Sequence, residues 1–277
     1  MNLKNSFKEK GYFIYKNFFD KNIIDNIIND IIQILKKYLD NKNINYNIKL
    51  ESIDLIYDML DNLYKIDKEL YFSFTRQNGI LSNLYNIKKL FSNEKVQEIY
   101  NDLNFKNISI PVTPQINLYC NFAVDKDYRN GKIGLDAHQD WPQTRGSLNN
   151  FIIWIAFTNI NKNNAPILYV ENSNKEGFID GNCNSHNIVI DKYEETDYTP
   201  IELNKGDAII FNGWLVHKTS EFLDNEKIRF AVAIRVNDLD DKYFIENLYH
   251  TSYETKMNRK KDQTRIPTID EINNSLN

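Results

Sequence analysis

The chain of 277 residues carries 34 Lys and Arg against 38 Asp and Glu, which gives a formal net charge of -4. This balance creates no basic field of the kind that binds nucleic acid or an anionic membrane, so neither partner is expected. The sequence has no signal-peptide core and no apolar run long enough to cross a membrane, and Cys120 and Cys183 suggest neither a disulfide framework nor a cysteine zinc motif. We therefore expect a cytoplasmic, globular protein.

The N-terminal third predicts mostly helical structure. Residues 12–19 follow Gly11 and are rich in aromatic and β-branched side chains, which predicts an opening strand. Asp20 then stands where a helix N-cap is expected, because isoleucines and leucines recur at helical spacing over about 23–38. Helical stripes continue over about 52–103, so the part at about 1–106 is expected to pack as helices against a sheet.

From residue 108 the sequence changes to short β-like runs separated by loops of Asn, Gly, Asp and Lys. This pattern is typical of a β-sandwich or a closed double sheet. No Pro-, Gly- or Ser-rich linker marks the change. We therefore predict one domain over residues 1–277, with a mainly β core at about 107–237 and helices packed on it. The charged segment 238–277 is expected to form a cap or an oligomer contact.

The run 112–122 alternates between polar and apolar side chains. On a strand, one face then carries only the polar residues, which are Gln115, Asn117, Tyr119 and Asn121. Such a face is either exposed to solvent or lines a wet cavity, and we favour the cavity because a histidine motif follows shortly. The run 151–158 is nearly continuous in apolar residues, which predicts a strand covered on both faces.

The histidines supply the clearest chemical signal. His138 and Asp140 are two residues apart, so at a strand end they would project from one face, roughly 7 Å apart. His217 follows a Gly206-Asp207 turn and a short apolar run, and it offers a third ligand. Two histidines and one carboxylate form the facial set of non-haem Fe(II) oxygenases, which leaves three positions open on an octahedral ion. A hydrolytic zinc site stays an alternative.

The last predicted strand shows the clearest alternation. Arg229, Ala231, Ala233 and Arg235 share one face, and the other face is wholly apolar. A charge followed by small side chains suits a cavity wall along which an anionic molecule lies. Arg229 would hold the far end of that molecule, because a guanidinium can grip a carboxylate with two hydrogen bonds.

Together these motifs resemble the phytanoyl-CoA dioxygenase family of Fe(II)- and 2-oxoglutarate-dependent oxygenases. The likeness covers about Gly11 to Val236. It rests on His138-Gln-Asp140-Trp, on Trp154 within Phe-Ile-Ile-Trp-Ile-Ala-Phe, on Asn163-Asn-Ala-Pro-Ile-Leu-Tyr-Val with the loop after it, and on His217-Lys-Thr219 with Arg229. The resemblance implies a double-stranded β-helix core, which is a jelly-roll or cupin-like fold.

The resemblance also implies roles for individual residues. In that family the two histidines and the aspartate bind Fe(II), and 2-oxoglutarate and O2 take the remaining positions. The counterpart of Arg229 binds the distal carboxylate of 2-oxoglutarate, and Thr219 matches a hydroxyl position that assists it. Trp154 matches an aromatic residue beside the cosubstrate, and Tyr119 is expected there as well.

Two loops depart from the family pattern. Asn164-Ala-Pro166 stands where Asn-Gly and a small residue are usual, and Glu171-Asn-Ser-Asn replaces the more common Pro-Gly-Ser-His. Both departures concern the substrate and leave the chemistry unchanged. Asp140 is retained, whereas related halogenases have a small residue there, so halogenation is not expected. The resemblance implies an enzyme that hydroxylates an unactivated C–H bond and releases succinate and CO2.

We expect the substrate to be a small or medium polar metabolite, such as an anionic or nucleotide-linked compound. The residues expected on its side of the cavity are Gln115, Asn117, Trp141, Arg145 and Trp214, with Arg76 and Arg235 as further anion contacts. Three alternatives stay open: desaturation, epimerisation or ring closure at the same site, a non-catalytic jelly-roll module that holds a metal or a sugar, and a structural partner protein. Arg229 argues against the module, which has no need for a buried cosubstrate arginine.

Overall fold

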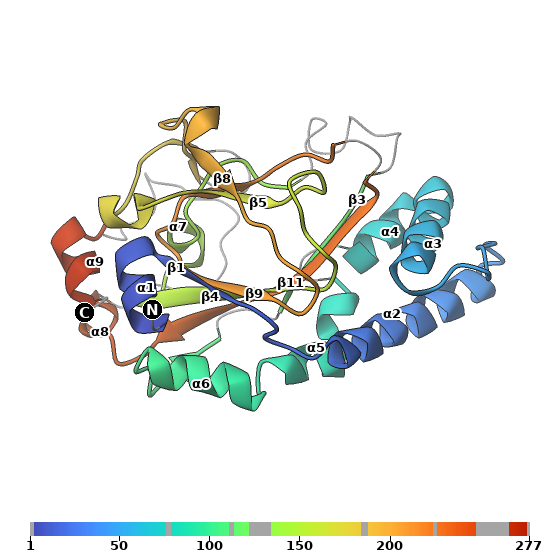
Figure 1. The fold of residues 1–277 in the computed structure, drawn as a ribbon, viewed down its shortest axis with the longest axis horizontal. Coiled ribbons are helices and arrows are strands. Elements are labelled where there is room, and N and C mark those ends of the chain that lie inside the picture. The colour runs from blue at the N-terminus through green and yellow to red at the C-terminus, as the bar shows by residue number, and fades with distance from the viewer. Residues whose placement is uncertain are drawn as a thin grey trace.

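Two antiparallel sheets face each other in the computed structural model, and helices cover the outer side of the larger sheet (Figure 1). The structure describes residues 3–75, 79–110, 114–121, 134–183, 188–223, 226–247 and 266–275. This arrangement confirms the predicted jelly-roll core with flanking helices.

Most of the helical residues lie in the N-terminal third, as predicted. The helices are α1 (Leu3–Lys10), α2 (Lys21–Asn41), α3 (Ser52–Ile66), α4 (Lys68–Thr75), α5 (Tyr85–Leu90), α6 (Glu94–Asp102), α7 (Trp141–Thr144), α8 (Lys242–Asn247) and α9 (Ile269–Ser275). The strands are β1 (Tyr12–Tyr15), β2 (Ile108–Ser109), β3 (Gln115–Cys120), β4 (Asn150–Ala156), β5 (Ile167–Val170), β6 (Asn182–Cys183), β7 (Ile188–Val189), β8 (Tyr198–Pro200), β9 (Ala208–Asn212), β10 (His217–Thr219) and β11 (Ile228–Asp238).

The larger sheet has the strand order β1-β9-β4-β11-β2, and β3 also pairs with β11. The smaller sheet has the order β10-β5-β8. Every pairing in both sheets is antiparallel. In both strand orders, neighbouring strands such as β1 and β9 are far apart in the sequence. The sheets thereby bring residues from distant segments to one site.

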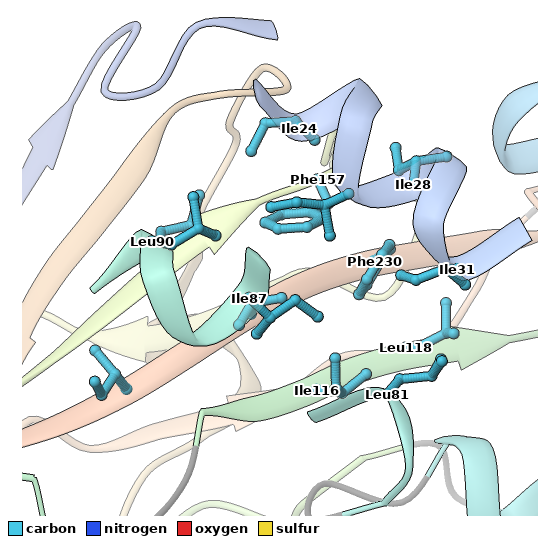
Figure 2. Packing of buried hydrophobic residues seen from close by; sticks show 14 of the residues in the cluster. Ile24, Ile28, Ile31, Leu81, Ile87, Leu90, Ile116, Leu118, Phe157 and Phe230 are labelled. Carbon is cyan, nitrogen blue, oxygen red and sulfur yellow. The ribbon is translucent and has the colours of Figure 1, made fainter. Parts of the chain in front are cut away.

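Helix α2 packs on the outer face of the larger sheet (Figure 2). Asp20 caps it by accepting a hydrogen bond from the backbone N–H two residues later, at 2.7 Å, as the sequence predicts. The helix side chains that point toward Phe157 and Phe230 include Ile24, Ile28 and Ile31. Full burial of each such side chain contributes roughly 1.5–3 kcal/mol, so this layer supplies much of the stability of the sheet.

Strand β11 is buried along its whole length, and its two faces belong to different cores. Its apolar face, with Phe230, Val232, Ile234 and Val236, joins the core under the helices. Ala231 and Ala233 join the smaller core between the two sheets. The predicted alternation is therefore confirmed, and the polar side of this strand faces the interior.

The segment around Asp140 differs from the prediction of a strand. His138 forms a single antiparallel bridge with His217, and Asp140 already has helical angles, with φ -75° and ψ -36°. Its carbonyl accepts hydrogen bonds from the backbone of Gln143 and Thr144, both at 3.1 Å. The predicted loop after Asp140 therefore begins with the helical turn α7, for which a proline at an early position is suited.

The C-terminal helices α8 and α9 lie beside each other and contribute Tyr243 and Ile272 to an apolar cluster. The other buried members of this cluster are Trp141, Leu148 and Trp214. Within the described residues, no helix is long and apolar enough to cross a membrane.

Asp207 ties the predicted Gly206-Asp207 turn to the segment before α2. Its carboxylate is 1% exposed and accepts hydrogen bonds from the backbone N–H of Asn17 at 2.8 Å and of Asn204 at 2.9 Å, and from Lys16 Nζ at 3.0 Å. Burial raises the pKa of Asp207, but these donors outweigh burial and lower it. The carboxylate form is therefore stabilised in the folded protein.

We expect Asp207→Asn to lower the free energy of unfolding by about 2–3 kcal/mol at pH 7, because hydrogen bonds to a charged group are lost. The pKa in the folded state lies below the unfolded value of about 3.9, so this stabilisation is present above that value and disappears as the pH falls below it. Urea denaturation at pH 7 and in acid measures both effects. Asp25→Asn is the control, since it removes an exposed partner of Lys205 and should change stability by less than about 1 kcal/mol. Equal losses in the two variants would contradict this role.

Candidate metal centre

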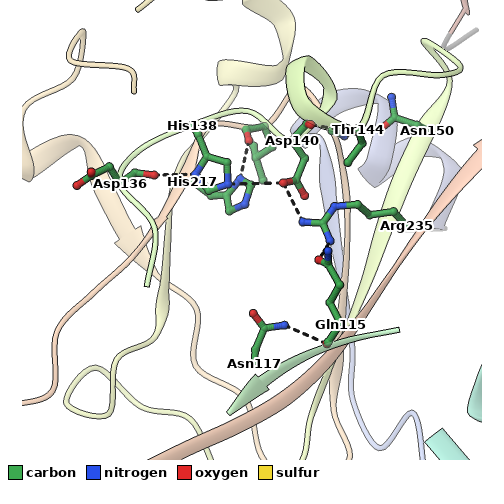
Figure 3. A network of polar contacts seen from close by, with 11 residues as sticks. Gln115, Asn117, Asp136, His138, Asp140, Thr144, Asn150, His217 and Arg235 are labelled. Carbon is green, nitrogen blue, oxygen red and sulfur yellow. Dashed lines mark hydrogen bonds and ion pairs between the residues drawn. The ribbon is translucent and has the colours of Figure 1, made fainter. Parts of the chain in front are cut away.

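Three buried side chains, those of His138, Asp140 and His217, converge at one point (Figure 3). Each offers one ligand atom, and these atoms all lie within 4.8 Å of one another. Two backbone hydrogen bonds set the histidines opposite each other, because each N–H donates to the carbonyl of the other residue, at 2.9 and 3.0 Å. Their ring centroids are 4.3 Å apart. The predicted three residues are thus brought together, although through one bridge and a helical turn.

The hydrogen bonds of the imidazoles fix which nitrogen is free. His138 Nδ1 lies 2.7 Å from the carbonyl oxygen of Asp136, and His217 Nδ1 lies 3.0 Å from that of Leu215. A carbonyl oxygen can only accept, so each Nδ1 carries a proton, and a neutral imidazole in this arrangement has its lone pair on Nε2. His138 Nε2 and Asp140 Oδ2 are buried and have no hydrogen-bond partner within the described residues. Buried polar atoms without partners are rare and indicate a missing ligand.

The electrostatics of the site favour the metal-binding forms of these groups. Burial raises the pKa of the Asp140 carboxyl, but the positive charge of the neighbouring Arg235 guanidinium lowers it, and the pKa lies well below its usual range. Burial lowers the pKa of His217 to about 4, and the nearby His138 acts in the same direction. At neutral pH the site therefore holds a carboxylate and a neutral His217 imidazole, which are the forms that bind a metal ion.

The donor set fits a non-haem iron site of the 2-His-1-carboxylate type. Two imidazole nitrogens and one carboxylate oxygen are available, and all three residues would hold the ion. Catalytic zinc sites also use three protein ligands, so the ligands alone do not separate iron from zinc. The surroundings of Arg229 bear on that choice.

Arg229 is a buried cation on strand β11. It is 1% exposed, its Nη1 donates to the carbonyl of Ala165 at 2.6 Å, and its guanidinium lies 4.3 Å from the centroid of the Tyr119 ring and 5.3 Å from that of Trp154. No carboxylate within the described residues pairs with it, and its Nε has no hydrogen-bond partner there. Burial lowers the pKa of Arg229 to about 10, so it stays charged at neutral pH. A buried cation of this kind is suited to bind an anion.

Thr219 lies next to the segment 165–166, which also contacts Arg229. It ends β10, and the next residue, Ser220, donates its backbone N–H to the carbonyl of Pro166 at 2.9 Å. The neighbouring Ala165 accepts from Arg229. The structure therefore brings all four predicted cosubstrate residues, Tyr119, Trp154, Thr219 and Arg229, to one region on β3, β4, β10 and β11.

The polar face of β3 turns inward. Gln115 is 1% exposed, its Oε1 accepts a hydrogen bond from Arg235, and its Nε2 is buried without a partner within the described residues. Asn117 is half-buried and donates to the backbone carbonyl of Gln115 at 3.3 Å. The burial of Gln115 argues against a fully exposed face, and the expected cavity stays a prediction. Contact of either residue with a substrate stays a prediction.

Trp141 and Trp214, which were expected on the substrate side, belong to the apolar cluster with the C-terminal helices. Their rings stack with centroids 4.7 Å apart, and their Nε1 atoms donate to the backbone carbonyls of Ser147 and Leu148, both at 3.1 Å. Both indoles are almost fully buried in this cluster. The structure thus places both rings in this cluster, and their contact with a substrate stays a prediction.

The remaining predicted contacts have different outcomes. Arg235, expected as an anion contact, pairs instead with Asp140 at 2.9 Å. Arg145 is buried directly after α7 with φ 50°, and its contact with a substrate stays a prediction. Arg76 lies outside the described residues.

Gln139 is a functional position that sequence reasoning missed. Its Nε2 donates to the carbonyls of Gly177 and Trp214, both at 2.7 Å, and its Oε1 accepts from the backbone N–H of Ile179 at 3.0 Å. The side chain between the two ligands His138 and Asp140 is thus fully engaged and anchors their segment. In the sequence, Gln139 stands out solely by its position between the two ligands. That position does not predict hydrogen-bond partners so far along the chain.

Comparison with known proteins agrees with this geometry. A family model described as phytanoyl-CoA dioxygenase (PhyH) matches residues 7–230, which is most of the chain. A search of curated proteins found no match.

Several solved structures share the fold. ThoJ, a non-heme monooxygenase in its apo form, has a TM-score of 0.58 at 13% identity and covers 86% of this chain and 77% of its own. The epimerase SnoN, in complex with Fe3+, alpha ketoglutarate and nogalamycin RO, has a TM-score of 0.56 at 11% identity over 96% and 90%. EctD from S. alaskensis, with 2-oxoglutarate and 5-hydroxyectoine, has a TM-score of 0.53 at 12% identity over 85% and 75%. At identities this low, the likeness shows a common fold alone.

Proposed function

We propose that this chain, which belongs to the phytanoyl-CoA dioxygenase (PhyH) family, is an Fe(II)- and 2-oxoglutarate-dependent oxygenase. Its proposed reaction is the hydroxylation of a C–H bond in a small or medium polar metabolite. The observation that carries the proposal is the combination of two buried sites. His138, Asp140 and His217 offer three converging ligand atoms, and within the described residues Arg229 is a buried cation without a carboxylate partner. A hydrolytic zinc centre explains the first site but has no use for the second.

Different residues would bind the iron and orient 2-oxoglutarate. His138 and His217 would hold the iron through Nε2, and Asp140 through its carboxylate. When bound, iron and 2-oxoglutarate supply the oxidising chemistry that inserts one oxygen atom of O2 into the substrate and leaves succinate and CO2. Arg229 would orient 2-oxoglutarate by its distal carboxylate.

The aromatic side chains around Arg229 would strengthen its ion pair with the distal carboxylate. Tyr119 and Trp154 cover the guanidinium with their rings and keep water away from it. An ion pair in such an enclosed place is stronger than in water. The half-buried Asn117 and the free amide of Gln115 offer polar groups to a substrate, which supports a polar metabolite over a long acyl chain.

Epimerisation is a second outcome of the same site, since the fold is shared with the epimerase SnoN over 96% of this chain. Both reactions begin with removal of a hydrogen atom from substrate carbon, so the residues named above serve either one. The products distinguish the reactions, because only hydroxylation adds an oxygen atom to the substrate.

The experiment that tests the proposal is 2-oxoglutarate turnover without a prime substrate. We expect slow, Fe(II)-dependent formation of succinate that requires O2, and a faster rate when a panel of polar metabolites contains the substrate. Consumption of a metabolite of the panel with Zn(II) and without O2, and with no succinate formed, would indicate a hydrolase. A folded, iron-loaded protein that forms no succinate with any metabolite would favour a non-catalytic binding module.

A further inference from the structure

The backbone carbonyl that contacts the buried Arg229 guanidinium belongs to a strained turn. Arg229 Nη1 donates to the carbonyl oxygen of Ala165 at 2.6 Å, and Ala165 is fully buried with φ 54°. A residue with a β-carbon is uncommon in this left-handed conformation, which persists only where the surrounding structure enforces it. The direction in which the Ala165 carbonyl points therefore depends on what holds the turn.

The side chain of Asn164 ties this turn together. Its Oδ1 accepts a hydrogen bond from the backbone N–H of Asn161, and its Nδ2 donates to the carbonyl of Asn159, both at 2.8 Å. These partners fix the orientation of the carboxamide, because an N–H must face the oxygen and a carbonyl must face the nitrogen. Asn164 is 3% exposed, so water has little access to replace either bond. The residue directly before Ala165 is thus fixed to the preceding loop.

Backbone hydrogen bonds hold the other side of the turn. Residues 163–166 are joined in this way to residues 220–223, with donor–acceptor distances between 2.6 and 3.2 Å. These bonds use main-chain atoms, which a substitution at Asn164 leaves in place. Loss of the Asn164 side chain is therefore expected to loosen the turn without unfolding the protein.

We propose that Asn164 is a positioning residue for the cosubstrate, because it holds the turn whose carbonyl, at Ala165, fixes the guanidinium of Arg229. The inference deepens the proposed function and rests on it, since it concerns the binding of 2-oxoglutarate by its distal carboxylate. A guanidinium is planar and binds a carboxylate with two hydrogen bonds when the two groups are aligned. The rings of Tyr119 and Trp154 lie against the guanidinium, and the hydrogen bond to the carbonyl limits its rotation between them.

This role predicts a loss of affinity that is confined to the distal carboxylate. In Asn164→Ala, the Kd of 2-oxoglutarate should rise by roughly 3- to 30-fold, the range that coupling between contacting residues produces. The affinities for Fe(II) and for pyruvate, which has no distal carboxylate, should stay at their wild-type values. Added to Arg229→Met, the same substitution should cause no further rise, because no guanidinium remains to be positioned. A general destabilisation would instead weaken the binding of both acids and add to the effect of Arg229→Met.

Anaerobic calorimetry of the Fe(II)-loaded full chain with 2-oxoglutarate and with pyruvate measures these affinities without turnover. Asn93→Ala is the matched control, since Asn93 caps α6 by accepting the backbone N–H of Lys95 at 3.1 Å, far from the turn in sequence. Its loss should lower the stability but leave the affinities for both acids unchanged. Urea denaturation of the metal-free protein compares the stability of Asn164→Ala with that of this control.

Asn164→Asp provides a second variant in case Asn164→Ala does not fold. Aspartate keeps an acceptor for the backbone N–H but loses the donor to the carbonyl of Asn159, so the Kd of 2-oxoglutarate should rise here too. A wild-type Kd in whichever of these variants folds would overturn the proposal. An equal rise for pyruvate, or a rise that adds in full to that of Arg229→Met, would overturn it as well. Failure of the Fe(II)-loaded wild-type protein to bind 2-oxoglutarate would instead reject the proposed function, so the two failures are distinguishable.

Discussion

His217→Ala is expected to abolish metal binding and turnover while the fold is retained. Its Nε2 is one of three candidate ligand atoms, and within the described residues the recorded hydrogen bond of the imidazole joins Nδ1 to the carbonyl of Leu215. The pairing of His217 with His138 and with Tyr169 uses backbone atoms, which alanine keeps. We expect the Fe(II) affinity, measured anaerobically by calorimetry, to fall by more than about 100-fold, which is the upper range for residues that only support a ligand.

Lys218→Ala is the control for this variant. Lys218 is the next residue on β10, and its Nζ lies 2.7 Å from Glu195 and 3.9 Å from the centroid of the Tyr198 ring. It should bind Fe(II) as the wild-type protein does. Urea denaturation checks that His217→Ala is folded, with a free energy of unfolding within about 2 kcal/mol of the wild type. A folded His217→Ala protein with wild-type Fe(II) affinity would contradict the assignment of this ligand.

Arg229→Met is expected to raise the 2-oxoglutarate concentration for half-saturation by about 10- to 100-fold, since hydrogen bonds to a charged group contribute about 1.5–3 kcal/mol and each 1.4 kcal/mol is tenfold. The cause is the loss of a buried cation that no carboxylate within the described residues neutralises. Methionine fills a similar space between Tyr119 and Trp154 but offers no hydrogen bond. The metal affinity should not change, because Arg229 is not one of the ligands.

A comparison of two 2-oxo acids sharpens this test. Pyruvate has the 2-oxo acid group but lacks the distal carboxylate, so the wild-type protein should prefer 2-oxoglutarate strongly and Arg229→Met should lose most of that preference. Lys227→Met is the matched control, because Lys227 is an exposed cation two residues earlier whose Nζ lies 5.7 Å from the centroid of the Tyr57 ring. If Arg229→Met keeps the wild-type preference, the distal carboxylate binds elsewhere.

The parts of the fold that the sequence predicts well are those with a local cause. The helical spacing after Asp20 depends on one buried face, and the cap depends on one side chain, so α2 begins where the pattern indicates. The alternation in β11 follows from a period of two residues, and the structure places Phe230 and Ala231 in different cores accordingly. The three metal ligands were predicted because their residue types already imply the chemistry.

The parts that the sequence could not predict depend on packing between distant segments. Arg235 and Asp140 are 95 residues apart, and the alternation of β11 shows which way Arg235 points without showing what it meets. Trp141 and Trp214 were expected beside the substrate because they adjoin the ligands in sequence. The helical turn after Asp140 and the C-terminal helices carry both rings into a separate cluster, where Ile272 contacts the same core.

The central claim is that His138, Asp140 and His217 form an iron centre that receives 2-oxoglutarate. Anaerobic titration of the Fe(II)-loaded protein with 2-oxoglutarate tests it most directly, because chelation of Fe(II) by a 2-oxo acid produces a weak visible charge-transfer band. We predict that the band appears in the wild-type protein and is lost in His138→Ala. Folded, iron-loaded protein that shows no band at saturating 2-oxoglutarate would contradict the claim.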